Sequence, residues 1–179
     1  SLKGYRIPEA GRQAKGTAIV NILPLEPGEK VTAMMPIHEF KEGKSLLFVT
    51  QNGVVKKTDL MDYANIRKNG LRAINLDEDD ELIRVDLTDG NSDVLLATYS
   101  GMAIRFNEND VREVGRVARG VKGIKLREGD KVVAAQIADD NGEILIVSEN
   151  GYGKRTKMNE FNSQNRGGIG VKAYKVTDK

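Results

Sequence analysis

The chain has 179 residues, of which 39% are hydrophobic and 30% charged, a size and balance that fit one folded domain with a sizeable core. It has no cysteine and a single histidine, His38, so disulfides, cysteine nucleophiles and multi-histidine metal sites are excluded. No run approaches the roughly 18 uncharged apolar residues of a membrane helix, and the first residues lack a signal-peptide core. The composition supports neither export nor membrane insertion, and it is compatible with a reducing compartment.

Internal repetition is the strongest signal in the sequence. Three apolar runs, each followed by a glycine and then basic or polar residues, cover residues 46–57, 95–105 and 144–155, with turn glycines at 53, 101 and 151. Sixteen to nineteen residues after each turn glycine comes the glycine of a second pattern, a Gly-led apolar run, at residues 69–74, 119–124 and 166–171, with an extra copy at 15–20. The period of 48 to 50 residues marks a repeat protein.

Each period is expected to hold four short strands, because Val- and Ile-rich runs alternate with Gly, Asn and Asp turn residues. In the first full repeat the predicted strands are 30–37, 45–50, 54–58 and 70–76, and the partial repeat before it contributes 4–7 and 16–22. The Asn-Gly pairs at 52–53 and 150–151 suit a type I′ hairpin turn. No helical periodicity is present, so the predicted fold class is all-β.

Four-stranded units recurring every ~50 residues are typical of propeller-like folds. The predicted units are a partial blade at 1–28 and three blades at 29–80, 81–130 and 131–179. Closed propellers typically need four or more blades, so about three and a half blades indicate one domain that is a piece of a larger ring.

The formal net charge is only +2, but the charge is distributed with the repeat. Residues 53–75 hold five basic and two acidic side chains, 101–127 seven and three, and 151–175 six and one. Acids gather in the intervening segments, for example at 77–81. Because equivalent positions of successive blades lie on equivalent faces, this pattern predicts a basic stripe around the rim.

A basic stripe indicates that the partner is a polyanion. Duplex DNA is the expected partner because its phosphates are regularly spaced, and the stripe would bind the DNA backbone without reading the base sequence. The alternative is a propeller-like interaction module that binds an acidic protein. The candidate DNA-binding residues are Arg12, Lys15, Lys56, Lys57, Arg67, Lys68, Arg72, Arg105, Arg116, Arg119, Lys122, Lys154, Arg155, Arg166 and Lys172. Glycines in the Gly-led strands could serve close packing between blades or close approach to a phosphate. No nucleophile with a paired base is present, so neither catalysis nor a bound cofactor or metal is expected.

Residues 2–23, 115–124 and 152–156 strongly resemble the C-terminal domain of the A subunit of bacterial DNA gyrase. This resemblance implies a six-bladed β-pinwheel that wraps DNA around its basic rim and thereby supports the introduction of negative supercoils, here from the end of the second blade through the fifth. It also implies a bacterial cytoplasmic protein whose further partners are the gyrase A core and the gyrase B subunit. The similar domain in the A subunit of topoisomerase IV is the close alternative.

The family's hallmark box has the form Gln-basic-Arg-Gly-Gly-basic-Gly and belongs to a first blade that this chain lacks. Residues 164–170 resemble it, but Asn165 and Ile169 occupy its two basic positions, so we interpret them as the ordinary blade version. In this family the catalytic tyrosine and the ATP site lie in other parts of the enzyme. The resemblance therefore implies a non-catalytic domain of an ATP-dependent type II topoisomerase.

Overall fold

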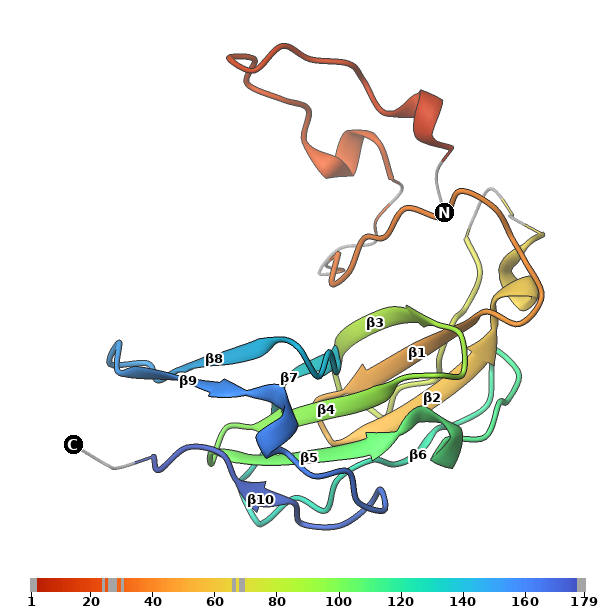
Figure 1. Cartoon of the computed structure of the whole chain (residues 1–179). Coiled ribbons are helices and arrows are strands. Elements are labelled where there is room, and N and C mark those ends of the chain that lie inside the picture. The colour runs from red at the N-terminus through yellow and green to blue at the C-terminus, as the bar shows by residue number, and fades with distance from the viewer. Residues whose placement is uncertain are drawn as a thin grey trace.

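Ten short β-strands carry the fold in the part of the chain that the computed structural model describes, residues 3–23, 25, 29, 31–65, 67 and 70–176 (Figure 1). The helices among the described residues are short 3-10 turns, two before β1 and three after later strands, and none of them could cross a membrane. The strands are β1 Ser45–Thr50, β2 Val54–Asp59, β3 Leu82–Thr88, β4 Asp93–Thr98, β5 Met102–Asn107, β6 Val121–Lys122, β7 Val132–Ile137, β8 Glu143–Val147, β9 Gly153–Lys157 and β10 Val171–Lys172. The turns are η1 Gly4–Arg6, η2 Ile19–Asn21, η3 Leu60–Tyr63, η4 Glu108–Asp110 and η5 Met158–Glu160.

Three antiparallel hairpins, β1–β2, β4–β5 and β8–β9, form the centre of the repeats at the predicted positions. Their turn glycines Gly53, Gly101 and Gly151 have φ of 77°, 79° and 81°, whereas no non-glycine residue in the described ranges has positive φ. A type I′ turn needs positive φ at two residues, so the expected turn type is wrong. Only the glycine supplies the left-handed step, as in longer loops built on a type I turn.

Each four-stranded sheet combines strands from two consecutive repeats. The first sheet has the order β3-β1-β2-β6, and the second has the order β10-β5-β4-β7. In both, the central hairpin of one repeat is flanked by the first and last strands of the next repeat. The sheets do not coincide with the sequence repeats, because each sheet crosses a boundary at 81 or 131. The division of the chain into blades at 29, 81 and 131 therefore stays a prediction.

The expected strands at 4–7, 16–22, 31–37 and 70–76 are wrong: η1 and η2 occupy the first two segments, and no strand forms in the others. The first residue of the expected strand 30–37, Lys30, lies outside the described residues. The reason follows from the sheet order. The corresponding segments of later repeats become β3, β6, β7 and β10 only by pairing with the preceding hairpin. The structure describes no hairpin before β1 for the early segments to join.

The core lies between successive sheets. Alternate residues of each central strand face the preceding and the following repeat. Leu47 and Val49 of β1 pack against Val94 and Leu96 of β4 in one buried cluster. Leu95, on the opposite face of β4, packs instead with residues of the third repeat such as Ile146. The first and second hairpins thus each contribute one face to each of two neighbouring cores.

Glycines allow the outer strands to approach the hairpins closely. A Cβ on Gly120 would overlap the carbonyl oxygen of Val55 and lie 2.6 Å from Val54 Cγ1, and one on Gly170 would overlap the Ala103 carbonyl oxygen. Gly70, fifty residues before Gly120, has no such neighbour. Of the two roles expected for these glycines, close packing between repeats accounts for Gly120 and Gly170.

We predict that Gly120→Ala lowers the free energy of unfolding by about 2–4 kcal/mol, because the methyl group must displace backbone of β2. Gly115→Ala is the matched control, since nothing lies within 4 Å of its added Cβ and its φ is not positive. Urea unfolding of both variants measures the difference. Equal stabilities would contradict the close-approach argument.

Candidate nucleic-acid interface

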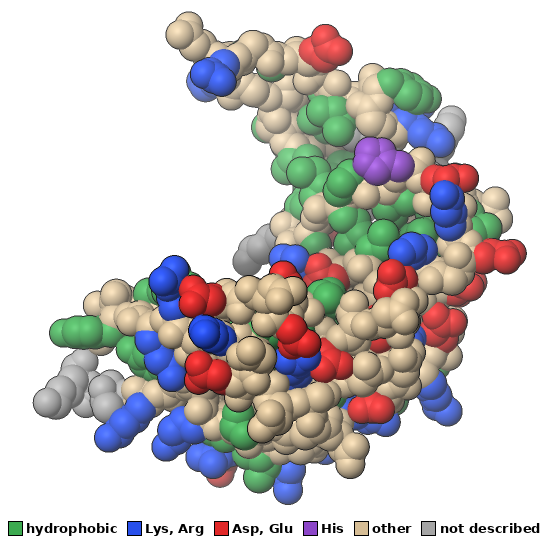
Figure 2. Space-filling view, viewed as in Figure 1, with side chains coloured by type: hydrophobic (Ala, Val, Ile, Leu, Met, Phe, Trp, Pro, Cys, Tyr) green, Lys and Arg blue, Asp and Glu red, His purple; other side chains and the backbone are tan. Residues whose placement is uncertain are grey.

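The strands β6 and β10 lie at corresponding edges of the first and second sheets and carry exposed lysines at equivalent positions. Lys122 pairs through its backbone with Val54, and Lys172 pairs with Met102. Lys125 and Lys175 follow three residues later and are also exposed. Figure 2 shows a row of Lys and Arg side chains along the edge where Figure 1 places β6 and β10, with few acidic side chains among them; elsewhere on this face basic and acidic side chains are mixed. We call Lys122, Lys125, Lys172 and Lys175 the basic edge.

Lysines on edge strands have a second role, because charge there discourages pairing with another chain. That role is independent of any ligand. Protection of an edge requires some charge there, but it does not require lysines at equivalent positions of two sheets, as Lys122 and Lys172 are.

The first third-strand cation, Lys56, is fully buried, with an exposed fraction of 0%. Its Nζ donates to the carbonyl oxygens of Ala73, at 2.7 Å, and Arg116, and it lies 5.6 Å from the centre of the Phe48 ring. Burial lowers the pKa of Lys56 to about 8; nearby Asp62 raises it and Arg116 lowers it further. This ammonium ties two loops to β2, and its hydrogen bonds leave it inside the protein.

Lys57, next along β2, is also buried. Its Nζ lies 3.9 Å from Glu108 Oε2 and donates to the carbonyl oxygen of the same glutamate at 3.3 Å. Glu108 is itself fully buried, and its Oε1 accepts hydrogen bonds from the backbone N–H groups of Gly90 and Ser92. The pair joins the first repeat to the 3-10 turn of the second.

Arg105 occupies in β5 the position that Lys57 has in β2, four residues after the turn glycine. It bonds Asp93 at 2.8 Å and Asp140 at 2.7 Å, and it reaches the carbonyl oxygens of Met158 and Phe161 at 3.4 Å. The hydrogen bond to Asp140 is the largest influence that raises the pKa of Arg105. Burial alone raises the pKa of Asp93, but hydrogen bonds from Asn107 and Arg105 outweigh it and hold that pKa below its ordinary value.

The expectation that third-strand cations line an exposed rim is therefore wrong for Lys56, Lys57 and Arg105. Their side chains point between repeats, where backbone carbonyls and carboxylates of the next repeat hold them. Lys154 and Arg155, the equivalent pair of β9, are exposed, and Arg155 forms a surface ion pair with Glu143 at 3.2 Å. The described residues contain no later repeat that would cover them.

The loop cations differ among themselves. Arg119 is exposed and lies 3.4 Å from Asp77, with 79% of its side chain accessible. Arg166 is half-buried, and its guanidinium donates to the carbonyl oxygens of Asp110 and Lys122 at 2.8 and 3.0 Å. It links the second and third repeats. Arg116 is half-buried as well.

The sheet register also corrects the alignment of the Gly-led segments. Val121 and Val171 pair with Val55 and Ala103 in equivalent positions, so Gly120 corresponds to Gly170. The sequence pattern matches Gly120 with Gly167, and this match is wrong. The counterpart of Arg119 is therefore Ile169, and that of Arg166 is Arg116.

Four further predicted residues, Arg12, Lys15, Arg67 and Arg72, are exposed, and Lys68 lies outside the described residues. The structure places Arg12 and Lys15 on the N-terminal segment, which extends away from the sheets (Figure 1). Sequence reasoning missed Lys125 and Lys175. Their spacing of fifty residues, equal to that of Lys122 and Lys172, was a signal that could have found them.

The four-stranded antiparallel sheets, repeated side by side without closure into a barrel, define a β-pinwheel or propeller-like domain. The family of the DNA gyrase C-terminal domain, described as a β-propeller, matches the chain in four segments, residues 1–38, 44–89, 92–139 and 142–179. The chain therefore belongs to the DNA gyrase C-terminal domain family.

The relatives agree with this assignment. The DNA gyrase A subunit of Clostridium acetobutylicum is 55% identical over 119 residues, which cover 66% of this chain and 14% of that protein. A crystal structure of the C-terminal domain of DNA topoisomerase IV matches with a TM-score of 0.82 and 39% identity over 87% of this chain and 49% of that one. A DNA gyrase A C-terminal domain matches with a TM-score of 0.81 and 31% identity, over 93% and 56%. The chain thus spans about one seventh of the curated relative and about half of each solved domain.

The pKa of Lys56 predicts a pH dependence of stability. The unfolded chain holds the lysine proton up to about pH 10.5, whereas the folded chain releases it near pH 8. Between these values the unfolded state binds more protons, so folding becomes more favourable as pH rises. The stability of the wild type relative to Lys56→Met should increase from pH 7 to pH 10 in urea titrations. A pH-independent difference would show that the folded pKa is not lowered.

Proposed function

We propose that this chain binds duplex DNA by its phosphate backbone, without reading sequence, and that it bends the duplex along the basic edge. The observation that carries the proposal is the recurrence of two exposed lysines after fifty residues: Lys122 of the edge strand β6 recurs as Lys172 of β10, and Lys125, three residues later, recurs as Lys175. Both pairs occupy the same place relative to the preceding hairpin. A regular row of cations suits a partner whose charges are regularly spaced, and duplex DNA has one phosphate charge per ~1.7 Å of axis.

The buried cations support the same proposal indirectly. Lys56, Lys57 and Arg105 are held by protein groups, so they contribute little to the outward field. The acidic turn 77–81 contacts the β1–β2 turn through Asp80 and the loop before β6 through Asp77, so the four exposed lysines lie beside carboxylates that set one limit of the cationic surface.

In the longer protein, we infer a role in wrapping DNA for a type II topoisomerase that introduces negative supercoils. The family membership and the relatives among gyrase A subunits support this role. In this proposal the chain supplies geometry, while DNA cleavage and ATP hydrolysis belong to the gyrase A core and to the gyrase B subunit. Bending a duplex of 20–30 base pairs smoothly costs about 1–6 kcal/mol, which phosphate contacts must offset.

A matched pair of substitutions tests the basic edge. Lys172→Gln removes a charge from β10, whereas Lys131→Gln removes one beside β7, at the opposite edge of the same sheet. We expect Lys172→Gln to weaken binding to all duplex sequences alike and to lower the slope of log K against log salt by about 0.9. Lys131→Gln should leave the slope nearly unchanged. Fluorescence anisotropy over a salt series measures both slopes.

Equal effects of the two substitutions would contradict a localised edge. A loss confined to some sequences would indicate base contacts, and saturation that is indifferent to duplex length would favour the acidic-protein alternative, for which DNA is a poor mimic.

A second experiment separates wrapping from binding. Relaxed circular DNA is incubated with the chain, treated with a nicking-closing enzyme and deproteinised, and its linking number is then measured on a gel. If the duplex follows a curved edge, the topoisomer distribution should shift in proportion to the protein bound. An unchanged linking number under conditions of proven binding would contradict bending along the edge by this chain.

A further inference from the structure

The base of a hairpin, where its first strand begins and its second strand ends, contacts the following repeat in the same register in the first two hairpins. Beside β2, Lys57 forms a parallel bridge with Glu113, and beside β5, Arg105 forms one with Ser163. In both places the backbone N–H of the next residue donates to the carbonyl oxygen of the cation at 2.9 Å. Glu113 and Ser163 therefore hold equivalent positions.

The side chains that meet at these two positions are exchanged between the hairpins. Ser45, the buried first residue of β1, donates a hydrogen bond from its hydroxyl to Glu113 Oε1. Asp93, the first residue of β4, faces Ser163, which contributes a hydrogen bond to it. The hydroxyl thus comes from the hairpin in the first case and from the following repeat in the second, and the carboxylate comes from the opposite side each time.

A second exchange surrounds the cation. Lys57 Nζ lies 3.9 Å from a carboxylate oxygen of Glu108, which belongs to η4 of the following repeat. The equivalent residue of η5 is the buried Met158. Arg105 instead bonds Asp140, in the turn after β7, at 2.7 Å. Each cation therefore meets a carboxylate of the following repeat, but a different segment supplies it.

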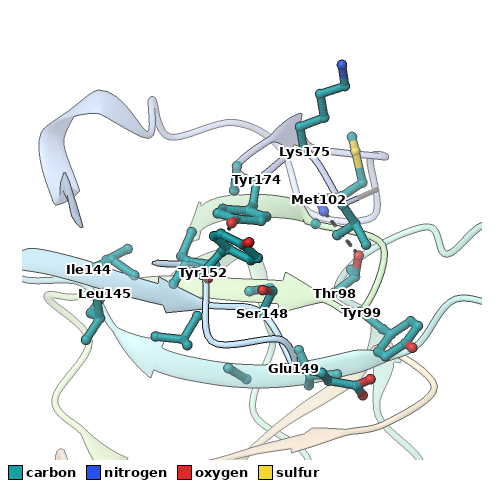
Figure 3. Close-up of a pocket in the computed structure, with 18 of the residues that line it drawn as sticks. Thr98, Tyr99, Met102, Ile144, Leu145, Ser148, Glu149, Tyr152, Tyr174 and Lys175 are labelled. Carbon is teal, nitrogen blue, oxygen red and sulfur yellow. Dashed lines mark hydrogen bonds between the residues drawn. The ribbon is translucent and has the colours of Figure 1, made fainter. Parts of the chain in front are cut away.

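The turn ends of the two hairpins show no such difference. The hydroxyl oxygens of Thr50 and Thr98 each accept a hydrogen bond from the backbone N–H four residues later, at 3.2 and 3.3 Å. Figure 3 shows this contact between Thr98 and Met102. Asp80 and Asp130, from the following repeats, each accept a hydrogen bond from a turn N–H at 2.9 Å. The turn ends are thus interchangeable, and only the bases distinguish the two hairpins.

We propose that the base contacts are specificity-determining, so that each hairpin accepts its own following repeat and disfavours the other. If the second hairpin received the second repeat, Asp93 would face Glu113, and two carboxylates would repel each other. If the first hairpin received the third repeat, Ser45 would face Ser163, and neither side would supply the carboxylate. Unfavourable contacts with a wrong partner are a general source of specificity.

Repeat proteins need this kind of discrimination, because similar repeats that dock in the wrong order are a characteristic misfolding hazard. Here the strand pattern, the turn contacts and the backbone register are shared by both hairpins. Polar side chains at the base are therefore suited to fix the order of the repeats. The inference concerns contacts inside the chain and does not depend on DNA binding.

The test exchanges the residues between the two bases in the full chain. A hairpin exchange combines Ser45→Asp with Asp93→Ser, and a receiver exchange combines Glu113→Ser with Ser163→Glu. These variants and the fourfold variant that combines them all keep the composition and formal net charge of the wild type. In urea titrations, we expect each exchange alone to raise the unfolding equilibrium constant at least about tenfold, and the fourfold variant to return to within about threefold of the wild type.

Two controls separate charge from size and from position. Ser45→Asn has the size of Ser45→Asp without its charge, so it should cost less, and added salt should reduce only the loss caused by Ser45→Asp, because Glu113 is exposed to solvent. Adding Glu113→Ser to Ser45→Asp should restore stability. Adding Ser163→Glu, which lies at the other base, should not restore it.

Recovery in the fourfold variant, together with rescue only by the partner at the same base, supports the proposal. Losses that add up without recovery, or equal rescue by Ser163→Glu, would overturn it. Circular dichroism checks that each variant is folded. If an exchange alone does not fold, the fourfold variant decides: a folded fourfold variant supports the proposal, and an unfolded one overturns it.

Discussion

Pairing of the outer strands of one repeat with the hairpin of the repeat before it is the interaction on which this structure depends. An isolated two-stranded hairpin is marginal in water, and three or more strands are needed for independent stability. β1–β2 and β4–β5 meet that condition only because β3, β6, β7 and β10 come from later in the chain. Glycine at 120 and 170 lets the outer strands come within backbone contact. Local strand propensity and non-local pairing are therefore inseparable here.

The same interface explains the division of the basic residues into two groups. A cation on the third strand projects between repeats, where leaving it unpaired would be costly, and each buried example is held by carbonyl or carboxylate oxygens. A cation on the outer strand projects from the sheet edge and keeps its hydration. Lys57 and Lys122 are thus both part of one repeating charge pattern, yet the first joins repeats and only the second is available to a partner.

Sequence reasoning succeeded where the information is local. Gly53, Gly101 and Gly151 mark the hairpins, because a tight reversal needs positive φ that glycine adopts without strain. It failed where the outcome depends on a neighbour. Segment 31–37 has the pattern of a strand, but the described residues contain no preceding hairpin with which it could pair. Lys56 has the pattern of a surface charge, but it donates a hydrogen bond to the carbonyl oxygen of Arg116 and is buried. The mistaken match of Gly167 with Gly120 has a related origin, because only the pairing of β10 with β5 fixes that register.

These observations connect the core to the proposed function. The spacing and direction of Lys122 and Lys172 follow from how the first and second sheets pack, since each lysine is fixed in register to its own hairpin. That packing is set by the volumes of side chains such as Leu96, Val132 and Ala135. Protein interiors are close-packed, so a change of one or two methylene groups there alters the angle between sheets or leaves a cavity. If the basic edge bends DNA as proposed, the packing of this core determines how the lysines are arranged, and the arrangement of the lysines determines how far the bound duplex bends.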